Sequence, residues 1–200
     1  SYFGNFSLAL KRAGWQPVAL DSYRTYGHAF DQHRARMEAE GIDIRDYDDI
    51  GYDLSGFADE SFDAIICMGV IEHIPHTPRM LLDSIRRVLK PGGVAILDTP
   101  NLGYEYQRQK LMRGQTVFAP IETQFETDIP FEGHHREYLP EEMRWMLTRA
   151  GFEAVDIEMF NYSVYGFTEL TGEHLVRFRA MERDPNRREI ILAVAAKPQR

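Results

Sequence analysis

The chain has 200 residues, of which 44% are hydrophobic and 27% charged, and this composition excludes collagen, coiled-coil and disordered chains. Its formal net charge is −8, and no cluster of Lys and Arg provides the basic face of a nucleic-acid binder, so DNA and RNA are disfavoured as partners. No apolar run approaches the roughly 20 residues that a membrane span needs.

Helices alternate with short apolar strands along the chain, a pattern typical of βα units around a parallel sheet. We expect one domain over residues 1–200. In chain order the expected elements are a helix at residues 5–13, a strand at 17–20, a helix at 28–40, a strand at 42–45, a central strand at 62–71, a helix from 77, a turn at 91–93, a strand at 94–97, a helix at 140–150, and strands at 152–160 and 189–196.

Two stretches, residues 102–137 and 161–188, show no clean periodicity. Each is long for a simple connection, and such insertions are usually functional lids or mobile segments. We therefore expect both to form a lid over the pocket for an acceptor substrate.

Three stretches together resemble class I S-adenosylmethionine-dependent methyltransferases of the small-molecule subgroup. They are residues 61–74 (SFDAIICMGVIEHI), residues 87–93 (RVLKPGG), and residues 135–142 (HREYLPEE) followed by Ala150-Gly151-Phe152. The resemblance implies an α/β, Rossmann-like fold with a mostly parallel seven-stranded sheet whose last strand is antiparallel. It also implies a glycine-rich loop after the first strand. Of that loop, the sequence contains only Ser1-Tyr2-Phe3-Gly4. We therefore expect the first strand to be missing and further residues to precede Ser1 in the natural protein.

The resemblance implies S-adenosylmethionine as the cofactor. In open parallel sheets, ligands lie beyond the carboxyl ends of the strands, and this rule selects the residues where the expected strands end. A carboxylate after the second strand accepts hydrogen bonds from ribose hydroxyls, and the resemblance assigns the acid after the third strand to the adenine amino group. Asp48, Asp49 and Asp53 compete with Asp46 for that second role. The expected cofactor-binding residues are Tyr2, Gly4, Asp21, Ser22, Asp46, Met68 and Gly69, of which Gly4, Asp21, Asp46 and Gly69 should converge at one edge of the sheet.

Two histidines are candidate catalytic residues. A hydroxyl that accepts a methyl group must lose its proton, and His has a suitable pKa for taking it. His73, in the Glu72-His73 pair, is one candidate base, although the pair suits a structural role as well. His135 is the other, with the adjacent His134 as an alternative. His73 and His76 have a metal-like spacing, but prolines flank that turn, and we expect no metal site.

The function that these observations predict is methyl transfer to oxygen or nitrogen of a small-molecule acceptor, such as a sugar or secondary metabolite. Asp21 also fits nicotinamide-binding folds, so an NAD(P)-dependent Rossmann-fold oxidoreductase stays open, as does a non-catalytic methyltransferase-like binding module. The single cysteine, Cys67, lies in an apolar run and reads as a small buried hydrophobe. One cysteine cannot form an internal disulfide, which favours a cytoplasmic protein. The oligomeric state is not predicted.

Overall fold

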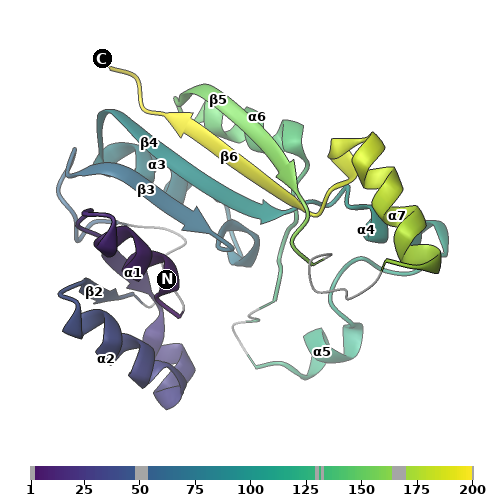
Figure 1. Cartoon of the computed structure of the whole chain (residues 1–200), viewed down its shortest axis with the longest axis horizontal. Helices are drawn as coiled ribbons and strands as arrows, with labels where there is room; N and C mark the ends of the chain where they lie inside the picture. The colour runs from purple at the N-terminus through teal and green to yellow at the C-terminus, as the bar shows by residue number, and fades with distance from the viewer. Residues whose placement is uncertain (1–2, 48–53, 129–130, 132, 164–169, 200) are drawn as a thin grey trace. The chain divides into compact units, whose positions relative to one another are not determined.

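The computed structural model describes residues 3–47, 54–128, 131, 133–163 and 170–199 (Figure 1). The chain divides into two compact units, Ser1–Asp53 (unit 1) and Leu54–Arg200 (unit 2). Each unit is described by itself, and the single domain expected over residues 1–200 stays a prediction. Tyr2 and the three alternative carboxylates, Asp48, Asp49 and Asp53, lie outside the described residues.

Unit 1 contains two parallel strands with helices around them. Its elements are α1 (Asn5–Arg12), β1 (Val18–Asp21), the 3-10 helix η1 (Tyr23–Phe30), α2 (Asp31–Ala39) and β2 (Asp43–Asp46). β1 pairs with β2 in parallel, with Asp21 opposite Asp46. The expected helix at residues 28–40 therefore begins later, at Asp31, because Gly27 breaks the preceding turn with φ 54° and ψ −134°.

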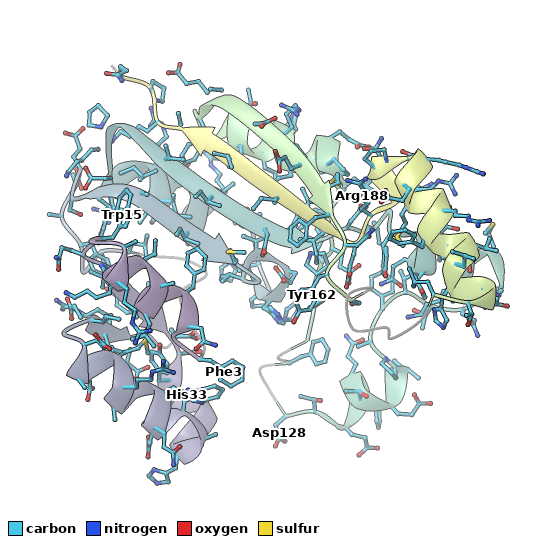
Figure 2. The ribbon with its side chains drawn as sticks, viewed as in Figure 1. Phe3, Trp15, His33, Asp128, Tyr162 and Arg188 are labelled. Atoms are coloured by element: carbon cyan, nitrogen blue, oxygen red, sulfur yellow. The ribbon has the colours of Figure 1, made fainter. Side chains whose placement is uncertain are left out.

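Apolar side chains of α1, β1, η1 and α2, together with the residue before β2, form the core of unit 1: Leu8, Ala19, Tyr23, Phe30, Met37 and Ile42. Phe3 adds an aromatic contact, with its ring centroid 5.4 Å from that of Phe30 and 5.0 Å from that of His33 (Figure 2). Gly4 precedes α1 with φ 71°, and a Cβ there would lie 2.4 Å from the Met37 sulfur. A side chain at this position is therefore opposed by both the backbone conformation and the packing.

Unit 2 is built on a four-stranded sheet of β3 (Phe62–Met68), β4 (Leu89–Pro100), β5 (Glu153–Phe160) and β6 (Ile190–Ala196), in the order β3-β4-β6-β5. β3 and β4 are parallel, and β6 runs antiparallel to both β4 and β5. The predicted antiparallel last strand is thus confirmed. Over the described residues the protein has six strands, two in the sheet of unit 1 and four in the sheet of unit 2.

Two amphipathic helices of unit 2 lie where the sequence predicts them. α3 (Arg79–Val88) buries Leu81, Leu82, Ile85 and Val88, the stripe expected from helical periodicity. α6 (Pro140–Arg149) begins with Pro at its first position, and the Glu142 side chain accepts a hydrogen bond from the backbone N–H of Leu139 at 2.9 Å. These local signals fix where α6 begins.

The central strand ends earlier than predicted. β3 stops at Met68 because Gly69 takes φ +63°, and Ile71–His73 forms a single 3-10 turn, η2. Residues 91–93, expected to form a turn, belong to the first part of β4. The register between β3 and β4 shifts there, between Phe62 and Ala64. The early end of β3 matters for the site, since it places Glu72 and His73 on a turn directly after the carboxyl end of that strand.

The described parts of the two insertions contain helices that their sequences do not predict. Residues 102–137 hold α4 (Glu105–Met112) and α5 (Ile121–Glu126), and residues 161–188 hold α7 (Gly172–Arg183) and the 3-10 turn η4 (Pro185–Arg187). α4 contacts α7 through a 2.7 Å hydrogen bond between Tyr106 Oη and His174 Nδ1. The two insertions therefore pack together, whereas their action as a lid stays a prediction. Among the described residues, none of the helices has the length and apolar character needed to cross a membrane.

Candidate active site

Unit 1 brings three of the predicted cofactor-binding residues together at the carboxyl ends of its strands. Asp21 ends β1 and is 8% exposed, and its Oδ1 accepts a hydrogen bond from the backbone N–H of Ser22 at 2.9 Å. Asp46 ends β2 directly opposite Asp21, with Arg34 3.9 Å from its carboxylate. The pairing of β1 with β2 thus confirms that Asp21 and Asp46 are neighbours, while their convergence with Gly69 of unit 2 stays a prediction.

In unit 2, a backbone hydrogen bond holds the loop after β3. The Gly69 N–H donates to Asp98 Oδ1 at 2.7 Å, and Asp98 lies opposite Met68 in the β3–β4 register. Burial raises the pKa of the Asp98 carboxyl, and the hydrogen bond from Gly69 partly offsets that rise. Met68 itself is 43% exposed. Asp98 was missed at the sequence level, although the rule that selected Met68 also applies to it, since Asp98 stands near the carboxyl end of the next strand.

Glu72, on the turn η2, is a buried carboxylate that also anchors a distant segment. It is 2% exposed, and the Thr99 hydroxyl donates to its Oε2 at 3.3 Å. Burial raises the pKa of its carboxyl, and a hydrogen bond from its own backbone N–H and the charges of His73 and His134 partly offset that rise. Its backbone carbonyl accepts a 2.7 Å hydrogen bond from the N–H of His135. This bond ties the segment before α6 to the turn after β3.

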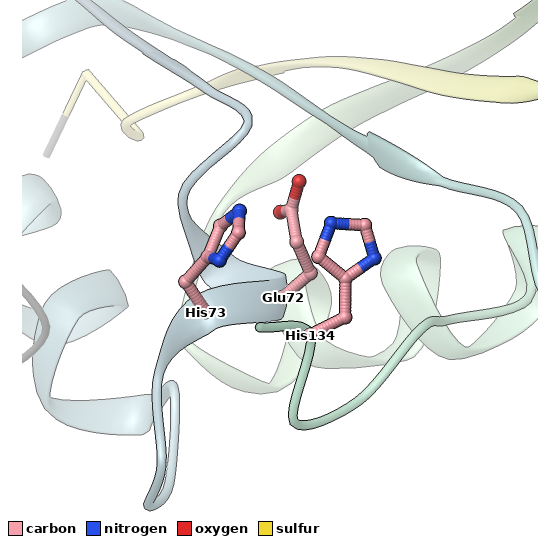
Figure 3. A group of neighbouring side chains, drawn as sticks. All are labelled: Glu72, His73 and His134. Atoms are coloured by element: carbon pink, nitrogen blue, oxygen red, sulfur yellow. The ribbon is translucent and has the colours of Figure 1, made fainter. Parts of the chain in front are cut away.

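The hydrogen bond between His135 and Glu72 places His134 beside His73. The two rings are 4.7 Å apart and nearly perpendicular, at 83°. One nitrogen from each ring and a carboxylate oxygen of Glu72 all lie within 4.8 Å of one another, and Figure 3 shows the carboxylate between the two imidazoles. We call Glu72, His73 and His134 the Glu-His-His group. Among the described residues, these three could hold a metal ion, a combination that differs from the His73 and His76 pair considered at the sequence level.

The neighbouring His135 points elsewhere. Its Nε2 forms a 2.9 Å hydrogen bond with the backbone carbonyl of Phe131, and its ring packs against the Phe131 ring at 5.5 Å. His134 instead bonds through Nδ1 to Glu137 Oε1 at 3.0 Å, and this contact raises the pKa of His134. Of the two adjacent histidines, the structure therefore assigns His134 to the group, where the sequence favoured His135.

Two surface hollows of unit 2 lie apart from the Glu-His-His group. One, of about 580 Å³, is lined by α4 and α7 residues such as Gln109, Arg113 and Glu173. The other, of about 360 Å³, is lined by residues of α6, β5 and η4 such as Arg144, Met159 and Asn186. Neither includes Gly69 or the Glu-His-His group, so the group is identified by its chemistry rather than by a cavity.

Comparison with known proteins identifies the family and the fold of the chain. Residues 2–157 match the family described as "Methyltransferase domain", so the chain belongs to that family. The structure of an S-adenosylmethionine-dependent methyltransferase from Mesorhizobium loti aligns over 97% of this chain and 86% of its own, with a TM-score of 0.62 at 18% identity. At that identity the likeness shows the fold alone, which is the class I methyltransferase fold. The family match lends no support to the nicotinamide alternative.

Among curated relatives, the ubiquinone biosynthesis O-methyltransferase of Xanthomonas oryzae is 38% identical over 123 residues, which cover 56% of this chain and 49% of that protein. The enzyme of the same name from Psychrobacter cryohalolentis is 35% identical over 77 residues, 34% of this chain and 30% of that protein. The matched part thus spans from about a third to a half of these relatives.

Proposed function

We propose that the protein transfers a methyl group from S-adenosylmethionine to a hydroxyl oxygen of a small-molecule acceptor. Membership of the methyltransferase-domain family supports the reaction class. The names of the relatives, O-methyltransferases at 35% and 38% identity, support oxygen as the methylated atom. A sugar or secondary metabolite is the class of acceptor that we expect.

The cofactor residues that we propose fit the donor chemically. Asp21 and Asp46 offer two neighbouring carboxylates at strand ends, and carboxylates accept hydrogen bonds from ribose hydroxyls or an adenine amino group. Gly69 leaves the loop after β3 without a side chain, and its positive φ favours glycine. Ser22, Met68 and Gly4 complete the proposed set. S-adenosylmethionine, when bound, supplies a methyl group activated on a sulfonium sulfur.

The observation that carries the proposal is the Glu-His-His group beside Gly69. A Cβ on Gly69 would lie 3.8 Å from Glu72 Oε1, so the group adjoins the loop that we assign to the cofactor. A hydroxyl acceptor must lose its proton as it is methylated, and imidazoles next to a carboxylate promote that loss. His73 and His134 are therefore the proposed catalytic residues.

The test is an assay for S-adenosylhomocysteine formation by the purified protein, with S-adenosylmethionine and matched acceptors that carry a hydroxyl, an amine or neither. We expect product with hydroxyl acceptors and little with their amine counterparts. Calorimetry with S-adenosylhomocysteine and with NAD adds an independent readout. Binding of NAD alone would support the oxidoreductase, and binding of S-adenosylhomocysteine without turnover of any acceptor would support the non-catalytic module.

A further inference from the structure

We propose that the Glu-His-His group is a binding site for one divalent transition-metal ion, of which Zn²⁺ is the representative. The site deepens the proposed function and rests on it for its role in the reaction, but the binding of the ion can be tested by itself. All three ligands belong to unit 2: Glu72 and His73 to the turn after β3, and His134 to the segment before α6.

The ligand geometry supports an ion. The three candidate ligand atoms lie within 4.8 Å of one another. Two atoms bound to the same Zn²⁺ at about 2.1 Å can be at most about 4.2 Å apart, so an inward rotation of the side chains by roughly an ångström closes the group around the ion. Both histidines are accessible from solvent, whereas Glu72 is buried beneath them. The group is thus open on one side and has an entry path.

One imidazole is already oriented for coordination. His134 Nδ1 bonds to Glu137 Oε1 at 3.0 Å. In that arrangement Nδ1 carries the hydrogen, and Nε2 presents its lone pair for a metal. Histidine ligands commonly donate their second N–H to a carboxylate in this way, which fixes the tautomer and makes the ring a stronger ligand. Glu137 therefore acts as a positioning residue for His134.

The charge of the group favours a cation. Glu72 is 2% exposed, and its carboxylate accepts a 3.3 Å hydrogen bond from the Thr99 hydroxyl and another from its own backbone N–H. Asp98 is a second partly buried acid nearby, and its carboxylate accepts the N–H of Gly69. A buried carboxylate needs a partner charge or a proton, and a divalent ion held by Glu72 and the two imidazoles meets that need.

Two imidazoles and one carboxylate select the kind of ion. Imidazole suits Zn²⁺, Fe²⁺ and Co²⁺, whereas Mg²⁺ prefers oxygen ligands. Three protein ligands also leave at least one coordination position open. With an ion bound, the acceptor oxygen would occupy that position and the ion would lower the pKa of its hydroxyl. His73 and His134 would then promote proton loss as ligands of the ion, with the proton released to solvent.

The experiment measures binding of Zn²⁺ and Co²⁺ to the chelator-treated full chain, by calorimetry for Zn²⁺ and by visible absorption for Co²⁺. We expect one ion per chain, with binding of Mg²⁺ at least 100-fold weaker. His134→Ala and Glu72→Gln should each weaken Zn²⁺ binding by more than about 100-fold, and Glu137→Ala by about 10- to 100-fold. Circular dichroism and thermal unfolding check that each variant folds.

Two matched controls are available. His135→Ala removes the adjacent imidazole that bonds to Phe131, and His28→Ala removes an exposed imidazole of unit 1 whose partner is Asp31. Both should keep Zn²⁺ binding within twofold. Failure to bind Zn²⁺ or Co²⁺, or equal binding by the wild type and the His134→Ala and Glu72→Gln variants when these are folded, overturns the metal site. Methyl transfer measured after chelation tests the proposed function separately, because turnover without an ion would refute the metal role alone.

Discussion

The backbone N–H of His135 donates to the carbonyl of Glu72 at 2.7 Å, and this one bond joins the segment before α6 to the turn after β3. Its consequence is the Glu-His-His group, since it places the preceding residue, His134, beside His73 with 4.7 Å between ring centroids. His135 thus contributes its backbone to the site, while its own ring bonds to Phe131. The side chains of these two adjacent histidines therefore lie in different surroundings.

Replacing these two histidines separately tests that division. His134→Ala should lower the rate constant for methyl transfer by about 10²- to 10⁴-fold, the usual contribution of a group that assists proton loss. Its affinity for S-adenosylhomocysteine should change little. His135→Ala keeps the backbone N–H and should affect the rate far less. Single-turnover kinetics would measure both, and a larger loss for His135→Ala would show that the assignment is reversed.

Asp98 should hold the loop after β3 through its contact with Gly69. Asp98→Ala removes the acceptor of the Gly69 N–H and should lower the free energy of unfolding by about 1–3 kcal/mol. Asp98→Asn keeps an oxygen at the same position and is the matched control, for which we expect a smaller loss. Urea denaturation compares the two. Equal losses would indicate that the charge of Asp98, rather than its hydrogen bond, matters.

Much of the fold could be predicted from local sequence patterns. The apolar run from Phe62 and the stripe of α3 have periodicities that lead directly to a buried strand and an amphipathic helix. The end of β3 was predicted three residues late, because Val70 and Ile71 continue the apolar run while the positive φ of Gly69 ends the strand. α7 was missed because its face is mixed: Val176 is 65% exposed, and the charged Arg177 is buried.

The site was only partly predictable, for a physical reason. Glu72-His73 and Asp21 stand out because they follow apolar strands, a local signal. The roles of Asp98 and Thr99 depend on contacts with Gly69 and Glu72 across 29 and 27 residues. No periodicity reports a single hydrogen bond over such a separation. The choice between His134 and His135 likewise depends on where one backbone N–H points.

Asp21 provides a test of the cofactor assignment within unit 1. Asp21→Ala should weaken binding of S-adenosylhomocysteine by about 10- to 100-fold, since hydrogen bonds to a charged acceptor contribute about 1.5–3 kcal/mol. Asp43→Ala is the control, because Asp43 lies on β2 and its carboxylate is occupied by an exposed ion pair with Arg45. Isothermal calorimetry measures both affinities. Unchanged affinity for Asp21→Ala in a folded protein refutes the assignment.

Cys67 should make stability depend on pH at the alkaline end. Burial raises the pKa of its thiol from 9.0 to about 12, with the charge of Glu72 adding to the rise. Well below pH 9 the thiol is neutral in both the folded and the unfolded chain, so there it adds no pH dependence to the free energy of unfolding. Between pH 9 and about 12 the unfolded chain ionises first, and folding stability falls. Cys67→Ala removes this contribution.

Denaturation of the wild type and Cys67→Ala at a series of pH values isolates the thiol, because the tyrosines titrate equally in both proteins. We expect the difference in unfolding free energy to be constant below pH 9 and to move in favour of the variant above it. The same burial predicts that Cys67 reacts with a thiol reagent such as dithionitrobenzoate only after the protein unfolds, since the reactive thiolate is absent from the folded state near neutral pH. Rapid labelling of the folded protein would contradict both expectations, because it requires an accessible thiol.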